Sequence, residues 1–149
     1  MTTPIGHTYN GLGPAGILSA VVLLRGGSIL EPALLRTIPD CRAGRLLIQT
    51  NYHTGEPELH FLRLQKGIEG HSRVLLLDPQ MSSGGAALMA VRVLVDHGVS
   101  EERIVFVTYF AGRRGVGRLM AVFPNITVVV CRIGEDMEER WVEAKYLGC

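Results

Sequence analysis

Residues 78–86 contain the residue types that a phosphate-binding loop needs. The segment places a carboxylate, two serine hydroxyls and two adjacent glycines between an apolar run and a stretch with helical periodicity. Unpaired N–H groups at a helix start bind anions, glycines let the backbone curl around a phosphate, and serine hydroxyls donate to its oxygens. The candidate binding residues are Asp78, Pro79, Gln80, Met81, Ser82, Ser83, Gly84, Gly85 and Ala86.

Asp78 directly follows the apolar residues 74–77, which are typical of a buried strand. Its carboxylate is therefore placed to accept hydrogen bonds from the hydroxyls of a sugar. A purely structural interpretation stays open for the same loop, because Gly and Ser are frequent in strand-to-helix turns. In that interpretation Ser82 or Ser83 is the N-cap of the helix that follows.

Short apolar runs alternate with helical patterns along most of the chain. A helix is expected after residue 28, with Ser28 as its N-cap and Glu31 completing a capping box. Predicted strands cover residues 17–24, 45–49, 59–64, 74–77, 104–109 and 126–131, and predicted helices cover residues 86–96 and 115–122. The connection between the second and third strands is typical of a hairpin.

This alternation predicts an α/β fold with a mainly parallel sheet flanked by helices. Ligands of such sheets bind at the carboxyl ends of the strands, which is where residues 78–86 would lie. At 149 residues the chain has the size of one domain, residues 1–149. Within it, residues 1–16 are expected to form an irregular N-terminal arm, and residues 132–149 a divergent polar segment.

Charge and composition exclude several functional classes. Fifteen basic residues against fourteen acidic ones form no basic stripe, so nucleic acid is not an expected partner. No apolar run approaches the length of a membrane span, and the N-terminus lacks the order of a signal peptide, so no membrane partner and a cytoplasmic location are expected. Three cysteines without a CxxC and five scattered histidines predict no metal site built by the protein.

Three stretches of the sequence resemble one family. Residues 74–86, VLLLDPQMSSGGA, resemble the phosphoribosyl diphosphate motif of uracil phosphoribosyltransferases, which reads DPMLATGGT in the family. Residues 24–27 followed by EPAL are similar to the family's RAG and EPAL stretch. The segments IQTN, TGEPELH, LRL and AVRVLVDHGV resemble the phosphoribosyltransferase-like portion of uridine-cytidine kinase-like proteins. Together these matches cover roughly residues 21–132.

The resemblance implies a type I phosphoribosyltransferase fold with a β-hairpin arm. It also implies transfer of ribose 5-phosphate from phosphoribosyl diphosphate to uracil, giving UMP and diphosphate, with Mg²⁺ accompanying the diphosphate and a homo-oligomer as the assembly. Parts of the family bind GTP. By the same resemblance Arg25, Gly26 and Gly27 would contact the diphosphate, residues 82–85 the 5-phosphate, and Asp78 the ribose. For Arg25 a surface arginine after a strand is the alternative.

The sequence departs from the family pattern at several positions. Ser28 replaces an acidic residue, Ala86 replaces the threonine that closes the phosphate loop, and Thr50 aligns with an arginine of the family's hairpin. Residues 141–149, WVEAKYLGC, do not contain the family's glycine-rich uracil loop. Two further hypotheses therefore stand beside the enzyme: a binding or regulatory module that retains the phosphate loop, and a structural partner in an oligomer.

Overall fold

The computed structural model describes residues 2, 4–8, 10, 11 and 15–134. The strands are β1 (Leu18–Leu24), β2 (Arg42–Thr50), β3 (Pro57–Arg63), β4 (Arg73–Leu77), β5 (Gln80–Met81), β6 (Ile104–Gly112) and β7 (Thr127–Gly134). The helices are α1 (Glu31–Thr37), α2 (Gly85–Asp96) and α3 (Arg113–Val122), with 3-10 turns η1 (Gly26–Ile29), η2 (Ile68–Gly70) and η3 (Glu101–Arg103).

These strands form one mainly parallel sheet. Its order is β3-β2-β1-β4-β6, with β7 on the far side of β6. The short β5 continues along the β6 edge beyond β4, where Gln80 pairs with Phe110. Only the β2–β3 pair is antiparallel, so the predicted hairpin and the predicted parallel sheet are both confirmed.

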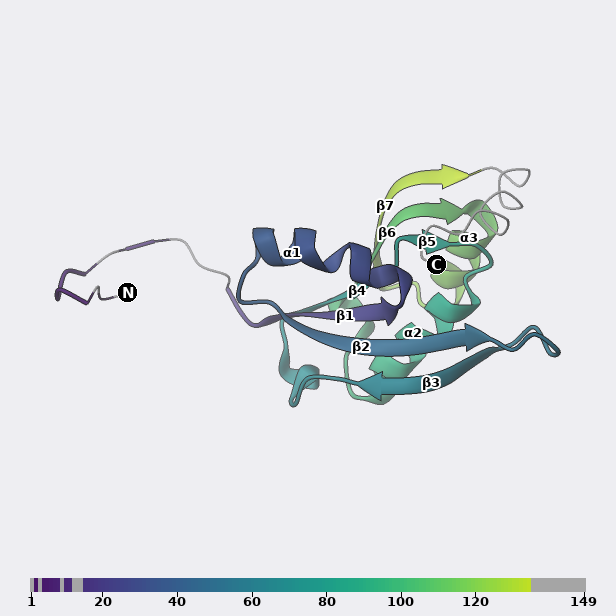
Figure 1. Ribbon diagram of the computed structural model, residues 1–149, viewed down its shortest axis with the longest axis horizontal. Coiled ribbons are helices and arrows are strands. Elements are labelled where there is room, and N and C mark those ends of the chain that lie inside the picture. The colour runs from purple at the N-terminus through teal and green to yellow at the C-terminus, as the bar shows by residue number, and fades with distance from the viewer. Residues whose placement is uncertain (1, 3, 9, 12–14, 135–149) are drawn as a thin grey trace.

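Helices cover both faces of the sheet, α1 on one and α2 with α3 on the other (Figure 1). The larger core lies between the sheet and α2 and α3, and its largest fully buried side chains include Phe106, Leu76 and Leu94. A smaller cluster lies beneath α1. Strand side chains alternate between faces, so the central strand β1 contributes to both clusters, which explains its continuous apolar sequence.

The start of the first helix differs from the prediction. Residues 26–29 form η1, and α1 begins at Glu31 without a side-chain cap, so the capping box at Ser28 is wrong. Glu31 is held instead by a distant residue on β2. Its two carboxylate oxygens accept hydrogen bonds from Nη2 of Arg45 at 3.0 and 3.1 Å. An ion pair across the fold thus takes the place of the expected local bond.

Hydrogen bonds within residues 51–58 shape the hairpin arm, which projects beyond the end of the sheet (Figure 1). The Oδ1 atom of Asn51 accepts from the N–H groups of His53 and Thr54 at 2.8 and 3.1 Å. Its Nδ2 group donates to Glu58 at 2.7 Å. No helix among the described residues is long and apolar enough to cross a membrane.

Candidate functional site

A cavity of about 240 Å³ lies at the carboxyl end of the sheet, where β2 ends and the chain passes from β4 to α2. Most of the predicted loop residues line it, together with two others. The lining consists of Thr50, Asp78, Gln80, Met81, Ser82, Ser83, Gly84, Gly85, Ala86 and Ala87. The structure therefore brings the contiguous loop into one concave surface, as expected for a ligand site of a parallel sheet.

Hydrogen bonds to β6 hold the first part of the loop. The N–H group of Asp78 donates to the Val107 carbonyl at 3.1 Å. The carbonyl of Pro79 accepts from the N–H groups of Tyr109 and Phe110, both at 3.0 Å. Pro79 is thereby turned toward the sheet edge, and it is the one predicted loop residue that does not line the cavity.

The second part of the loop leads into α2 without any side-chain cap. Its N-cap is Gly84, with φ of +81°, and the first helical bond runs from the N–H of Leu88 to the Gly84 carbonyl at 2.8 Å. The alternative in which Ser82 or Ser83 caps the helix is therefore wrong. The residues of the first turn lie at the cavity with their backbone N–H groups outside the helical ladder, which favours an anion there.

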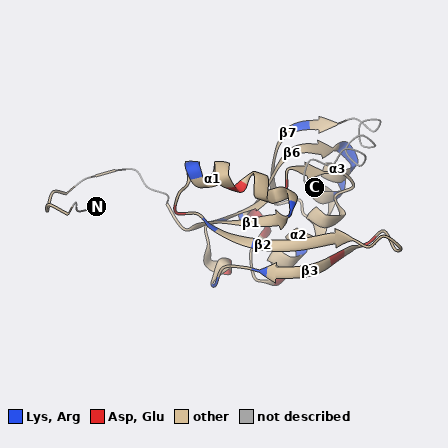
Figure 2. Cartoon of the chain, viewed as in Figure 1, with Lys and Arg blue, Asp and Glu red and all other residues tan. Residues whose placement is uncertain are grey.

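Helix α3 packs against this loop. The backbone of Gly84 lies so close to Gly115 that a Cβ atom on Gly84 would be 3.0 Å from the Gly115 carbonyl oxygen. A Cβ atom on Gly115 would collide with the carbonyl oxygen of Ser82. Nη1 of Arg118 donates to the Ser83 carbonyl at 2.9 Å. Figure 2 shows Lys and Arg gathered at α3, so this support also adds positive charge beside the loop.

Asp78 is the buried carboxyl group of the site, with 7% of its surface exposed. Burial raises its pKa from 3.8 to about 7, and a hydrogen bond from the backbone N–H of Gln80 lowers the pKa in part. Desolvation is the larger effect because a charged carboxylate loses its hydration in the protein interior. A carboxylate that ionises near neutral pH can accept hydrogen bonds from ligand hydroxyls.

The turn after β1 reaches the same edge of the sheet but does not line the cavity. A Cβ atom on Gly27 would collide with the carbonyl oxygen of Leu77, so the turn packs directly against the residue before Asp78. Gly26 and Gly27 are buried, whereas Arg25 is exposed, and the peptide bond between Leu24 and Arg25 is cis. The structure thus places Gly27, one of the three residues predicted to contact the diphosphate, against the residue that precedes the loop.

Three contributors to the site were not predicted as such from the sequence. Thr50 lines the cavity because β2 is parallel to β1 and ends at the same edge of the sheet, which only the strand pairing shows. Gly115 and Arg118 act from a helix more than thirty residues along the chain, and no local pattern marks them. Arg113 and Arg114 begin the same helix, α3.

The described residues do not build a metal site by themselves. No group of three or more His, Cys, Asp or Glu side chains that could hold a metal is present among them. Asp78 alone provides a carboxylate in the cavity lining. A Mg²⁺ ion, which prefers octahedral oxygen ligands and is often bound through substrate phosphates, would fit here only together with a phosphorylated ligand. The divergent residues 135–149 lie outside the described residues.

Comparisons with known proteins agree with this geometry. The uracil phosphoribosyltransferase family model matches residues 1–148. The chain is 41% identical over 138 residues to uridine-cytidine kinase-like 1 of Mus musculus, covering 92% of this chain and 25% of that protein. It is 33% identical over 148 residues to uracil phosphoribosyltransferase 1 of Schizosaccharomyces pombe, covering 99% of this chain and 67% of that protein.

Solved structures share the fold. The AQ2163 protein of Aquifex aeolicus superposes with a TM-score of 0.78 at 25% identity, covering 91% of this chain and 63% of that chain. A hypoxanthine phosphoribosyltransferase of Staphylococcus aureus superposes with a TM-score of 0.60 at 16% identity, covering 82% and 64%. The predicted type I phosphoribosyltransferase fold is confirmed. The chain spans about a quarter of the length of its kinase-like relative. Because the family model matches residues 1–148, the chain belongs to the uracil phosphoribosyltransferase family.

Proposed function

We propose that this protein transfers ribose 5-phosphate from phosphoribosyl diphosphate to uracil, giving UMP and diphosphate in pyrimidine salvage. The observation that carries the proposal is the cavity at the start of α2, lined by the loop and by the buried carboxyl of Asp78. Family membership supports the same reaction class. We place the reaction in the cytoplasm and expect a homo-oligomer, whose mass light scattering would measure.

Each part of phosphoribosyl diphosphate would contact a different part of the site. The 5-phosphate would bind the N–H groups at the start of α2 and the hydroxyls of Ser82 and Ser83. The carboxylate of Asp78, ionised above about pH 7, would accept from the ribose hydroxyls. The turn containing Arg25 would contact the diphosphate. This arrangement concentrates hydrogen-bond donors on a leaving group that gains charge as the bond to the ribose breaks.

We propose Mg²⁺ as a component of the substrate rather than of the protein. A magnesium ion bound to the diphosphate oxygens would offset the charge that develops on the leaving group. The carboxylate of Asp78 is the protein group available to contact the ion or its water shell. Omission of Mg²⁺ is expected to weaken binding of phosphoribosyl diphosphate, while the free protein keeps its fold.

A binding module without turnover is the second candidate. Thr50 lies in the cavity where an arginine aligns in the family pattern, and Ala86 supplies no hydroxyl. Both differences remove a hydrogen-bond donor for phosphate oxygens, and one charge-assisted hydrogen bond contributes about 1.5 to 3 kcal/mol. Such a module would bind phosphoribosyl diphosphate or a nucleotide without forming UMP.

Calorimetric titration of phosphoribosyl diphosphate with Mg²⁺, followed by addition of uracil and an assay for UMP, separates these candidates. Asp78→Asn is expected to weaken binding, and Asp96→Asn, at the exposed end of α2, serves as the control that leaves it unchanged. Formation of UMP by the wild type establishes the enzyme. Binding without UMP leaves the module, and absence of binding in the wild type refutes both.

A further inference from the structure

A second cavity, of about 380 Å³, lies at the amino ends of the parallel strands, where β1 and β2 begin and the chain enters β4. It is larger than the cavity of the phosphate loop, at about 240 Å³. Its lining consists of Gly16, Ile17, Leu18, Ile38, Asp40, Cys41, Arg42, Lys66 and His71. None of these residues has a part in the site described above.

The two cavities are separated by the length of the strands. β1 begins with Leu18 in the second cavity and ends with Leu24 beside the turn at Arg25. β2 begins with Arg42 in the second cavity and ends with Thr50 in the first. At about 3.3 Å per residue, β2 holds the two cavities roughly 26 Å apart, so one ribose phosphate cannot bridge them.

Hydrogen bonds across the fold fix the walls of the second cavity. Nε2 of Gln65 donates to the carbonyls of Ala20 at 3.1 Å and of Arg42 at 2.6 Å. The N–H and the hydroxyl of Ser72 both donate to the Ile17 carbonyl at 2.9 Å. The connection between β3 and β4 is thereby tied to the starts of β1 and β2. The cavity is preformed, which reduces the ordering that a ligand would require.

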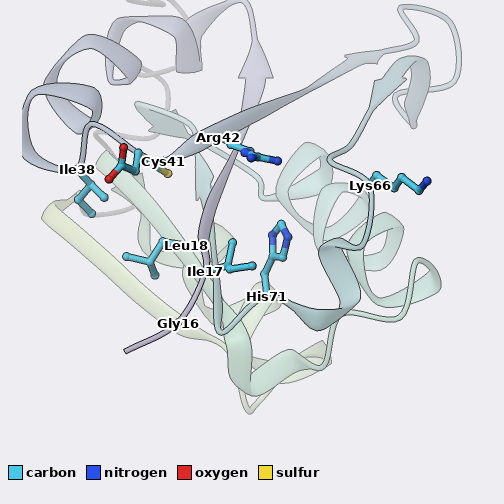
Figure 3. A pocket seen from close by; sticks show the side chains of 9 residues that line it. Gly16, Ile17, Leu18, Ile38, Cys41, Arg42, Lys66 and His71 are labelled. Carbon is cyan, nitrogen blue, oxygen red and sulfur yellow. The ribbon is translucent and has the colours of Figure 1, made fainter. Parts of the chain in front are cut away.

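The lining contains both apolar side chains and basic side chains. Figure 3 shows Leu18 and Ile38 on one side, and Arg42, Lys66 and His71 on the other. Arg42 and Lys66 are exposed, and neither side chain forms an ion pair within the described part of the chain. Asp40 is the only carboxylate of the lining, so the permanent charges sum to a single positive charge.

His71 adds a buried polar group to this lining. It is 6% exposed, and its Nδ1 atom is enclosed without a hydrogen-bond partner. Its backbone is held by a hydrogen bond from its N–H to the Ile68 carbonyl at 3.1 Å. The tautomer with the proton on Nε2 avoids an enclosed N–H without an acceptor, and it leaves Nε2 as the donor for a bound group.

We propose that this second cavity binds a small organic anion. The apolar body of the ligand would pack against Leu18 and Ile38, its anionic group would lie between Arg42 and Lys66, and Nε2–H of His71 would donate to it. The cavity volume of about 380 Å³ falls within the range of small-molecule sites, which begins at about 300 Å³. This binding does not depend on phosphoribosyl transfer.

The test is a titration of the ¹⁵N-labelled full chain with phenyl phosphate, followed by NMR, with inorganic phosphate as the comparison ligand. Phenyl phosphate is expected to shift the backbone amides of Leu18, Cys41 and His71 in a saturable manner. Inorganic phosphate, which lacks an apolar body, is expected to bind there at least tenfold more weakly. Equal shifts by both ligands would mean that only surface cations attract the anion, which overturns the proposal.

Variants locate the ligand. The double substitution Arg42→Gln and Lys66→Gln is expected to raise the Kd of phenyl phosphate at least tenfold, because each cation provides a charge-assisted contact. Two control variants are expected to leave the Kd of phenyl phosphate, followed at the amides of the second cavity, unchanged. They are Arg36→Gln, at an exposed position of α1 outside the lining, and Asp78→Asn. An unchanged Kd in the double variant, or shifts confined to residues 82–86, would refute the second site.

Discussion

At the scale of one residue, burial of the Asp78 carboxyl makes the stability of the fold depend on pH. The pKa of Asp78 in the folded chain, about 7, lies above the value of 3.8 for the exposed group because burial disfavours the carboxylate. The folded state therefore holds a proton that the unfolded state releases between these pH values. This contribution to stability is fully present below about pH 3.8 and is lost as the pH rises through about 7.

Asp78→Asn is expected to raise the free energy of unfolding at pH 8, because the amide stays neutral. At about 1.4 kcal/mol per pKa unit, the gain has an upper bound of roughly 4 kcal/mol. At pH 4 the free energies of unfolding of wild type and Asp78→Asn should differ little. Urea unfolding at both pH values measures the difference, and the exposed Asp96→Asn is the control. Equal stability of wild type and Asp78→Asn at pH 8 would contradict the buried carboxylate.

Ala86 provides a second prediction at the residue scale, because it lines the cavity without a hydroxyl. Ala86→Thr is expected to tighten binding of phosphoribosyl diphosphate about tenfold or more, since one hydrogen bond to a charged group contributes about 1.5 to 3 kcal/mol. Valine has nearly the same shape as threonine but no hydroxyl, so Ala86→Val serves as the control. Equal affinities of the two variants, measured by calorimetry, would show that residue 86 does not contact the phosphate.

Contact between α3 and the loop at residues 78–86 is the main feature at the scale of elements. Gly115 is pressed against the carbonyl of Ser82, whereas a Cβ atom on Gly117 of the same helix would meet no atom within 4 Å. Arg118 adds a hydrogen bond to the Ser83 carbonyl. The loop is thus held between β6 and α3, and its shape depends on the position of a helix that does not line the cavity.

Two glycine substitutions in α3 are expected to have opposite effects. Gly117→Ala should stabilise the protein by up to about 1 kcal/mol, because Ala has the higher helix propensity and the space around it is open. Gly115→Ala should destabilise the protein and weaken phosphoribosyl diphosphate binding at least tenfold, because α3 and the loop must separate. Urea unfolding and calorimetry of both variants test this pair. A Gly115→Ala protein with unchanged affinity would show that the loop does not need α3.

At the scale of the whole molecule, one candidate site lies at each end of the parallel strands. Between the two sites, the strands contribute side chains to both hydrophobic cores. A ligand that binds only the folded chain therefore stabilises the entire cooperative unit. The amount depends on ligand concentration relative to Kd and not on the position of the site. Thermal unfolding consequently reports binding at either edge, with or without turnover.

Phosphoribosyl diphosphate with Mg²⁺ at a hundred times its Kd is expected to add about 2.7 kcal/mol to the free energy of unfolding. For a chain of 149 residues, where 1 kcal/mol corresponds to about 2 to 4 °C, this is a rise in Tm of roughly 5 to 11 °C. Scanning fluorimetry checks the rise, with ligand-free protein plus Mg²⁺ as the reference. An unchanged Tm would argue against a phosphoribosyl diphosphate site in this chain.

Local sequence patterns were sufficient for most elements and for the contiguous part of the site. The apolar residues of β4, the helical spacing of α2 and the loop between them are each encoded within a few consecutive residues. Strand and helix periodicities are short-range properties, so the sequence reveals them independently of the packing. The two-residue β5 was not predicted, and the predicted cap at Ser28 was wrong, because the pairing of Gln80 with Phe110 and of Glu31 with Arg45 joins distant segments.

The sequence by itself determined the α/β class, the hairpin and a loop with the composition of a phosphate site. Only the tertiary structure decided that Thr50 enters the cavity, that Gly115 and Arg118 support the loop, and that His71 lines a second cavity with Arg42. The physical reason is that periodicity and turn chemistry act between neighbours in the chain. Cavities and supporting contacts arise where segments separated by tens of residues pack together.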